Sequence, residues 1–199
     1  MHALKMPLPS GLAEDALLRN SAKSRVQCLY DYVNSSLFNE HFQDLALLAT
    51  NCFKNGGTIY LAGNGGSFTQ AQHIAAEFTV KYKKDRPPLR SVTLGSNPAH
   101  ITACSNDYSY ESIFSRELKG QAQPGRDVLI AISTSGSSKN ILELLEVSAQ
   151  MSIERRLLSS NRCSDIHSHN VIKVPTADTD TAQEMHLVLL HSLCEAFEQ

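Results

Sequence analysis

The chain has 199 residues, of which 42% are hydrophobic and 19% are charged, values typical of one globular domain with a sizeable core. Its net charge of −2 argues against a general nucleic-acid binder, because such proteins normally carry a basic face. The five cysteines are scattered without a C-x-x-C pair, and no stretch approaches a membrane span or a signal peptide. We therefore expect a cytoplasmic protein with reduced thiols and with neither nucleic acid nor membrane as a partner.

The amino-terminal quarter of the chain is predicted to be helical. Residues 1–11 contain two prolines and a glycine and indicate a flexible leader. Apolar residues at helical spacing predict helices over about 12–34 and 36–54, and Asn55-Gly56-Gly57 ends the second one. Two helices ahead of the first strand are unusual in a minimal α/β domain. We therefore expect the helices of 12–55 to pack against other subunits.

A strand, a glycine turn and a helix follow in that order between residues 58 and 82. The apolar run 58–62 predicts a buried strand, the turn reads GNGGS (63–67), and the helix carries His73 and Glu77 on one face. Glycines let the backbone approach a ligand, and the N–H groups at a helix start attract an anion. Ser67 falls at the expected helix cap, where its hydroxyl serves the helix, the ligand or both. The turn matches neither a P-loop nor the dinucleotide motif, so a purely structural turn is the alternative.

The rest of the chain alternates strands with helices. Strands are expected at about 91–94, 127–132, 155–158 and 171–174, and helices at about 98–105, 111–118, 140–150 and 179–197. Such alternation builds a parallel sheet covered by helices on both faces. We therefore predict a single α/β domain over 1–199, with its α/β core at 58–199.

A second loop of the same kind follows the buried strand at 127–132. Its sequence, STSGSS (133–138), has five hydroxyls in six residues and leads into a helix. In open α/β sheets such loops line the crevice at the carboxyl ends of the strands, so we expect the two loops to converge on one phosphate. A serine-rich flexible turn is the alternative interpretation.

The closing helix adds candidate metal ligands. Gln183 and His191 are eight residues apart and lie on one stripe of the helix, whereas His186 points away from His191. Together with His73 and Glu77 they offer two imidazoles, a carboxylate and an amide oxygen, a set that suits Zn²⁺ or a similar divalent ion. The spacing alone does not establish that the two helices meet.

Four motifs in the order GNGGS, AQHIAAEF, AISTSGSS and AQEMHLVLLH closely resemble the phosphoheptose isomerases, a family of sugar-isomerase (SIS) domain enzymes. The resemblance spans about residues 20–199. It implies a flavodoxin-like parallel sheet, N-terminal helices that build a homotetramer, and active sites at subunit interfaces. It also implies conversion of sedoheptulose 7-phosphate to D-glycero-D-manno-heptose 7-phosphate, the first step of ADP- or GDP-heptose biosynthesis. The heptose would then enter lipopolysaccharide or another glycan.

The resemblance further implies roles for single residues. Glu77 and His191 match the family's acid–base pair, and His73, Glu77, Gln183 and His191 match the ligands of one zinc ion per subunit. The residues that match phosphate or sugar contacts are Asn64, Gly65, Gly66, Ser67, Asp107, Ser133, Thr134, Ser135, Ser138, Asp180 and Gln183. On this basis we expect Glu77 to take the carbon-bound proton and His191 to exchange protons with the sugar oxygens.

The chain departs from the family pattern in three places. Ser137 stands where an Asn is frequent, Lys81 stands where an Arg is common, and residues 159–169 replace a glycine-rich turn. Within that last segment His167 and His169 resemble a metal pair, although we expect them to be ordinary loop histidines.

The main functional alternative is a non-catalytic SIS-domain regulator of replication initiation that binds other proteins. Such regulators lack equivalents of Glu77 and His191, whereas this chain has both. A sugar-phosphate sensor for transcription and an isomerase of hexose phosphates are two further possibilities.

Overall fold

The computed structural model describes residues 15–164 and 170–199, so the predicted leader and the loop histidines His167 and His169 lie outside the described residues. The helices are α1 (Asp15–Val33), α2 (Ser36–Lys54), α3 (Gly66–Thr79), α4 (Pro98–Asp107), α5 (Ile113–Gln121), α6 (Lys139–Gln150) and α7 (Thr179–Ala196). The strands are β1 (Ile59–Gly63), β2 (Ser91–Thr93), β3 (Val128–Ile132), β4 (Glu154–Ser160) and β5 (Val171–Val174).

The strands form one parallel sheet in the order β2-β1-β3-β4-β5. This is the flavodoxin-like order, and it confirms the predicted fold class. The central strands β1 and β3 are buried along their whole length, as expected for a parallel sheet covered on both faces. Gly63 at the end of β1 is in register with Ile132 at the end of β3. The loops that follow these two strands therefore leave the sheet side by side.

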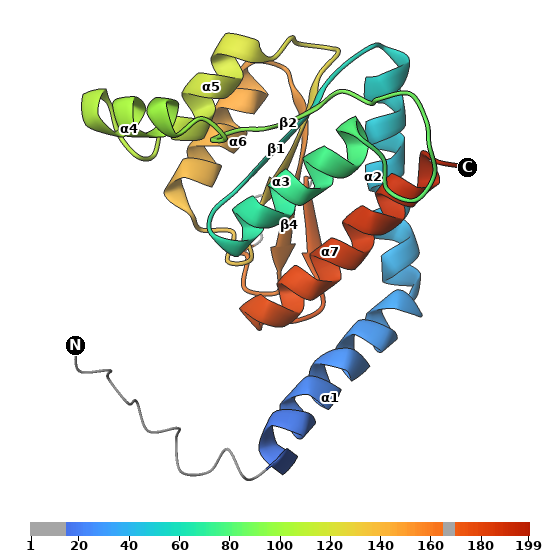
Figure 1. Ribbon diagram of the computed structural model, residues 1–199. Coiled ribbons are helices and arrows are strands. Elements are labelled where there is room, and N and C mark those ends of the chain that lie inside the picture. The colour runs from blue at the N-terminus through green and yellow to red at the C-terminus, as the bar shows by residue number, and fades with distance from the viewer. Residues whose placement is uncertain (1–14, 165–169) are drawn as a thin grey trace, which may run out of the picture.

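Helices cover both faces of this sheet (Figure 1). Alternate residues of β1 point to opposite faces, so Ile59 and Leu61 pack with α2, α3 and α7, whereas Tyr60 and Ala62 pack with α4, α5 and α6. Both sets of side chains are almost completely buried. The two cores fix α3 and α7 on the same face, next to each other, which determines where their polar side chains meet.

The first helix leads away from the body of the molecule (Figure 1). Its C-terminal end is anchored, because Tyr32 is buried against Val174 and Met185, and Arg25 bonds Glu184 of α7 at 3.1 Å. Between these two anchors, Val26 and Tyr30 remain 66% and 64% exposed. A bare apolar stripe on a protruding helix is typical of a surface that packs against another chain.

The observed element boundaries depart from the predicted ones by a few residues at the ends of elements. Helix α4 continues through Asp107, two residues beyond its predicted end, because Asn and Asp are tolerated in the last turn of a helix. Helix α3 ends at Thr79, and β4 is longer than expected at both ends. No helix within the described ranges is both long and apolar enough to span a bilayer.

Candidate active site

The two predicted ligand loops meet at the carboxyl edge of the sheet. Asn64 of the glycine turn donates from Nδ2 to Asn140 Oδ1 at 2.8 Å, and Asn140 donates back to Asn64 Oδ1 at 2.9 Å. Asn140 lies in the first turn of α6 and is buried. The glycine turn is therefore joined to the helix that follows the serine-rich loop, and the convergence of both loops on one phosphate stays a prediction. Sequence reasoning missed Asn140, because an asparagine early in a helix carries no distinctive signal.

The serine-rich loop presents several hydroxyls at this edge. Ser133 Oγ donates to Ser138 Oγ at 3.3 Å, and Ser135 Oγ accepts the Ser137 hydroxyl at 2.9 Å. Gly136 has a φ of +65°, and a Cβ at this position would collide with Cys163, so the turn requires glycine. Ser138 is the N-cap residue of α6, yet its side chain makes no capping bond. The loop thus brings serine hydroxyls to the start of α6, where N–H groups of the first turn attract an anion.

Helix α3 begins at the glycine turn, but Ser67 is not its cap. The N-cap residue is Gly65, with a φ of +54° and no side-chain bond to the helix. Ser67 lies in the first helical turn and is only 5% exposed. The prediction that Ser67 caps the helix was wrong, because the glycine conformation lets the chain enter the helix earlier. No capping side chain therefore bonds the first N–H groups of α3.

Helices α3 and α7 bring the predicted imidazole pair together. The Nε2 atoms of His73 and His191 lie 2.9 Å apart, with the rings edge to face. At this separation one ring donates a proton and the other accepts it. Glu77 Oε1 lies 3.6 Å from His73 Nε2, one helical turn along α3. The structure thus establishes the helix contact that spacing could not, and it places a carboxylate beside two imidazoles.

The fourth candidate ligand, Gln183, lies at the start of the same helix contact. A Cβ on Gly66 would come within 2.6 Å of Gln183 Nε2, so the amide side chain reaches the glycine turn. The backbone carbonyl of Gln183 accepts a hydrogen bond from Gln70 Nε2 at 2.7 Å. The Oε1 atom of Gln70 is buried without a partner among the described residues. Sequence reasoning missed Gln70, although its spacing from His73 and Glu77 on one helix face was a usable signal.

The surroundings of His191 favour a neutral imidazole. Burial lowers the pKa of His191, the neighbouring His73 lowers it further, and Glu77 opposes both effects. A neutral ring can accept a proton at one nitrogen and release it from the other. His186, as predicted, lies elsewhere: it is buried with Nε2 3.0 Å from the Ser159 carbonyl, and burial lowers its pKa to about 4.

Comparison with known proteins agrees with this geometry. Residues 31–154 match the SIS domain family. A phosphoheptose isomerase from Thermodesulfovibrio yellowstonii is 37% identical over 171 residues, covering 83% of this chain and 85% of that protein. The chain belongs to the phosphoheptose isomerase family. Solved phosphoheptose isomerases from Francisella tularensis and Neisseria gonorrhoeae superpose with TM-scores of 0.84 and 0.81, at 27% and 28% identity. These alignments cover 92% and 90% of this chain and 96% and 95% of the two structures.

The zinc ligands expected for a phosphoheptose isomerase can be tested on the donor geometry. No group of three or more His, Cys, Asp or Glu side chains is already arranged as a metal site in residues 15–164 and 170–199. Two nitrogens bound tetrahedrally to one zinc ion would lie about 3.3 Å apart. The 2.9 Å between His73 and His191 is only slightly shorter, and Glu77 adds a carboxylate oxygen nearby. The donor set therefore fits a zinc ion after a small rotation of either ring.

Two carboxylates that the phosphoheptose isomerase pattern places near the sugar lie apart from the imidazoles. Asp107 accepts a bond from Asn106 at the end of α4, and Asp180 is reached by Arg25 of α1 at 3.4 Å. Within the described part of the chain no hydrogen bond or ion pair joins either carboxylate to His73 or His191. Their predicted role thus depends on substrate or on a neighbouring subunit.

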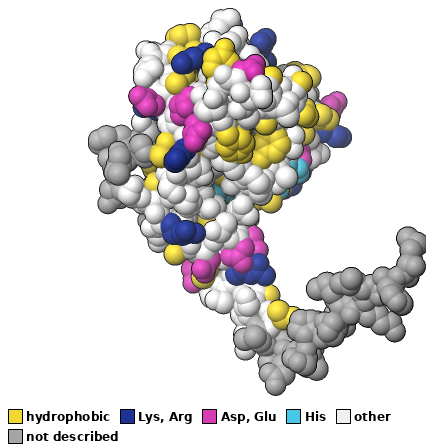
Figure 2. Space-filling view, turned by 90° about the vertical axis from the view of Figure 1, so that its left-hand side faces the viewer, with side chains coloured by type: hydrophobic (Ala, Val, Ile, Leu, Met, Phe, Trp, Pro, Cys, Tyr) yellow, Lys and Arg dark blue, Asp and Glu magenta, His cyan; other side chains and the backbone are white. Residues whose placement is uncertain are grey.

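A pocket of about 200 Å³ opens beside the glycine turn. Asn64 and Gly65 form one wall, and Phe68, Ile101 and Phe114 are among the apolar residues of the other. Tyr110 closes the pocket and donates its hydroxyl to Asn64 Oδ1 at 3.2 Å. Figure 2 looks onto the side of the molecule on which α4 lies in Figure 1, and it shows hydrophobic side chains gathered on this face. The pocket extends the candidate site along the carboxyl edge of the sheet.

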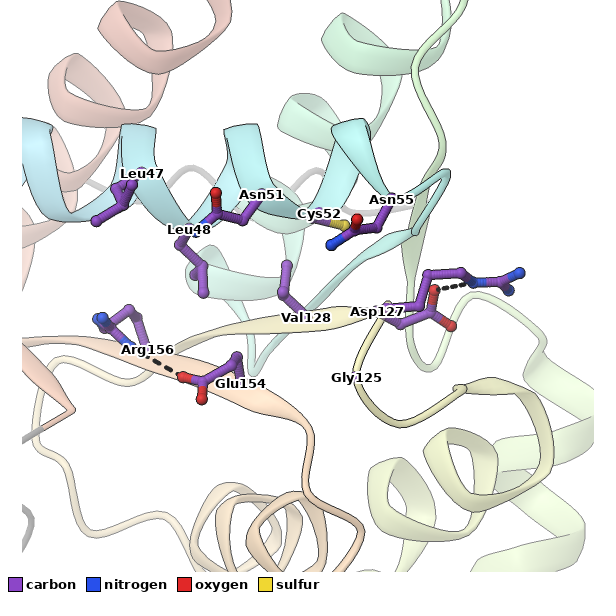
Figure 3. Close-up of a pocket in the computed structure, with 11 residues that line it drawn as sticks. Leu47, Leu48, Asn51, Cys52, Asn55, Gly125, Asp127, Val128, Glu154 and Arg156 are labelled. Atoms are coloured by element: carbon purple, nitrogen blue, oxygen red, sulfur yellow. Dashed lines mark hydrogen bonds and ion pairs between the residues drawn. The ribbon is translucent and has the colours of Figure 1, made fainter.

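A second pocket, of about 330 Å³, lies between α2 and the first residues of β3 and β4 (Figure 3). It is at the amino edge of the sheet, opposite the two loops. Its charged side chains are paired with one another or with near neighbours: Arg126 bonds Asp127 at 3.2 Å, and Arg156 bonds both carboxylate oxygens of Asp44 at 2.6 Å. Because these charges are already neutralised, this pocket is a poorer candidate for a sugar phosphate.

Proposed function

We propose that the protein is an aldose–ketose isomerase that converts sedoheptulose 7-phosphate to D-glycero-D-manno-heptose 7-phosphate. The observation that carries this proposal is the facing pair His73 and His191 with Glu77 beside it, on two helices that start next to the coupled loops. Such an isomerisation requires a base for a carbon-bound proton and an acid for the oxygens, and these side chains offer both. The relatives named phosphoheptose isomerase support the same activity.

The phosphate would bind at the carboxyl edge of the sheet, between the glycine turn and the serine-rich loop. The hydroxyls of Ser133, Ser135 and Ser138 and the uncapped starts of α3 and α6 support this placement. Each helix dipole supplies only about 0.3–1 kcal/mol at an exposed site, so hydrogen bonds from hydroxyl and N–H groups would carry most of the affinity. Thr134 fixes the loop, because its carbonyl accepts the Ser160 hydroxyl at 2.6 Å.

Proton transfer would be divided between two side chains. Glu77 removes a proton from C1 of the ketose to give an enediol and returns it to C2 to give the aldose. His191 moves the proton of the C1 hydroxyl to the oxygen on C2, so that atoms and charges balance over the whole step. A lowered pKa supports this role for His191, because a neutral ring can accept and donate in turn.

A zinc ion, which we include in the proposal, would be held by His73, Glu77, Gln183 and His191. When bound, the ion would stabilise the negative charge that develops on the sugar oxygens. Glu77 and His191 would then each have two tasks: coordination would weaken Glu77 as a base and would leave His191 one ring nitrogen for proton transfer.

We further propose a homotetramer that acts in the cytoplasm and supplies heptose for lipopolysaccharide or another glycan. The exposed apolar side chains of α1, among them Leu18, Val26 and Tyr30, support an assembly through the N-terminal helices. All five cysteines are free, and four of them are buried, which agrees with a reducing compartment.

The phosphoheptose isomerases that this chain resembles in sequence and in structure give no support to a non-catalytic regulator. A regulator of that kind also gives no reason for a carboxylate and two imidazoles to be held together on adjoining helices.

The direct test is NMR spectroscopy of sedoheptulose 7-phosphate incubated with the purified protein, with zinc, with a chelator, and with zinc restored. We expect aldose resonances to grow in with zinc, to stop with the chelator, and to resume afterwards. Unchanged ketose in the presence of zinc-loaded, folded protein would refute the proposed reaction. Conversion that persists undiminished with the chelator would refute the metal while leaving the reaction intact.

A further inference from the structure

One buried carboxylate fastens the segment after α3 to the end of the chain. Glu198 lies just beyond α7, and its side chain accepts three consecutive backbone N–H groups: Tyr82 at 2.6 Å, Lys83 at 2.7 Å and Lys84 at 2.9 Å. The Glu198 side chain is only 1% exposed. Hydrogen bonds to a charged, buried acceptor are short and strong, so this contact defines the path of residues 82–84.

Arg86 completes the anchor from the side of α3. Its guanidinium donates to the carbonyl groups of Glu77 at 2.7 Å and Phe78 at 2.8 Å, and its Nε lies 3.9 Å from Glu198. The Arg86 side chain is 8% exposed. The same cluster therefore joins the last turn of α3, which carries Glu77, to the residues that follow α7, the helix that carries His191.

The anchored segment places an aromatic ring on His191. The rings of Tyr82 and His191 are stacked, with centroids 5.0 Å apart and planes inclined by 18°. His73 meets the same imidazole edge to face, with centroids 5.1 Å apart. The imidazole is thus held on one face by Tyr82 and at its Nε2 by His73, two contacts that restrict its rotation.

We propose that Tyr82, held in place by Glu198, is a positioning residue for His191. This inference rests on the proposed function, in which His191 transfers protons between sugar oxygens. Tyr82 acts through the imidazole, so its loss should lower turnover. Substrate affinity should be unchanged, because the phosphate is bound by the separate glycine and serine loops. A displacement of about 1 Å in a catalytic group can cost about 10²-fold in rate. A partial loss of orientation should therefore lower kcat by about tenfold.

The experiment combines steady-state kinetics with NMR of protein labelled with ¹³C at the histidine rings. The stacked phenol shields the His191 ring protons, and the His191 resonance is assigned from its absence in His191→Gln. Tyr82→Leu should lower kcat about tenfold with KM changed less than about twofold, and should shift the His191 resonance downfield. Tyr82→Phe keeps the stacked ring and should restore both properties.

Glu198→Gln tests the anchor itself. The amide keeps one accepting oxygen but sets its NH₂ group against at least one of the backbone donors, so we expect a smaller fall in kcat and a smaller shift of the same resonance. Glu154→Gln is the matched control, because Glu154 lies at the start of β4, at the amino edge of the sheet, and its side chain is 75% exposed beside Arg156. It should change neither property.

The outcomes separate this inference from the proposed function. A His191 resonance that stays in place in Glu198→Gln, which keeps the phenol ring, would overturn the positioning role, as would a KM that rises in Tyr82→Leu as much as kcat falls. If wild-type protein fails to isomerise the sugar, the proposed function fails, and the position of the His191 resonance in Glu198→Gln, which keeps the phenol ring, still decides whether the anchored Tyr82 orients the imidazole. Should Tyr82→Leu fail to fold, as judged by circular dichroism, Glu198→Gln and Tyr82→Phe carry the test.

Discussion

Replacing Glu77 with glutamine isolates the basicity of one side chain. The substitution leaves the shape of the residue and one oxygen for a metal, and it removes the negative charge. Its structural cost should be small: the carboxylate lies 3.6 Å from His73 in an i,i+4 pair, and such pairs contribute about 0.3–0.5 kcal/mol. Arg86 bonds the backbone carbonyl of Glu77, so that contact is unaffected. The free energy of unfolding should thus fall by less than about 1 kcal/mol.

The effect on turnover should be far larger than the effect on stability. General acid–base catalysis contributes about 10²–10⁴-fold, so kcat should fall at least about 10²-fold, which corresponds to about 2.7 kcal/mol in the barrier. The assay follows isomerisation by NMR and, in D₂O, the exchange of the C1 proton. Both should stop in Glu77→Gln, while Glu154→Gln, at the opposite edge of the sheet, should match the wild type. If exchange and turnover both continue near wild-type rates, Glu77 is at most a metal ligand and His191 becomes the first candidate for the base.

Three more predictions concern binding, assembly and stability. Ser135→Leu should raise KM about 10–100-fold in initial-rate measurements, because it removes a hydrogen bond to a charged group; an unchanged KM would exclude the serine loop as the phosphate site. Light scattering should give about four times the chain mass of 21.9 kDa, and a monomer at micromolar concentration would contradict the proposal of active sites at subunit interfaces. His186 has a folded-state pKa of about 4, below its unfolded value, so the unfolded state binds a proton first as the pH falls. Urea unfolding should lose about 2 kcal/mol of stability between pH 7 and pH 5, and His186→Gln should lose less.

The sequence was informative wherever one local pattern determined the structure. Apolar runs predicted every strand, and the rule that loops gather at the carboxyl ends of parallel strands predicted the meeting of GNGGS with STSGSS. Gln183 and His191 were predicted to share one face of the last helix, and both side chains do face α3 and its glycine turn, because helical periodicity determines which residues share a face. In each case the relevant residues are close together in the chain, or the topology of the fold is sufficient to join them.

The contacts that sequence reasoning missed join residues that are distant in the chain and ordinary in type. Asn140 and Asn64 are 76 residues apart, and neither amide signals the other. Glu198 is 116 residues from Tyr82, and a glutamate near the end of a chain usually lies in solvent. Ser67 is a different case: the preference of serine for helix caps predicted that Ser67 caps α3, whereas the helix begins earlier and its N-cap residue is Gly65. Tertiary packing decides such cases, and one sequence alone does not contain that information in readable form.

The exposure of the imidazole pair connects the proposed chemistry with the proposed assembly. The side chain of His73 is 47% exposed in the single chain, whereas that of Glu77 is 18% exposed. Removal of a carbon-bound proton proceeds best where bulk water is kept out, because each electrostatic contact to the enediol then becomes stronger. The single chain leaves the site half open, and it also leaves the apolar stripe at Val26 and Tyr30 on α1 uncovered. Both needs would be met by copies of the same chain packed through their N-terminal helices, with a neighbour closing over α3 and α7. Assembly would then be a condition of turnover, and a change that separates the subunits should cost activity even where the sheet and its loops remain folded.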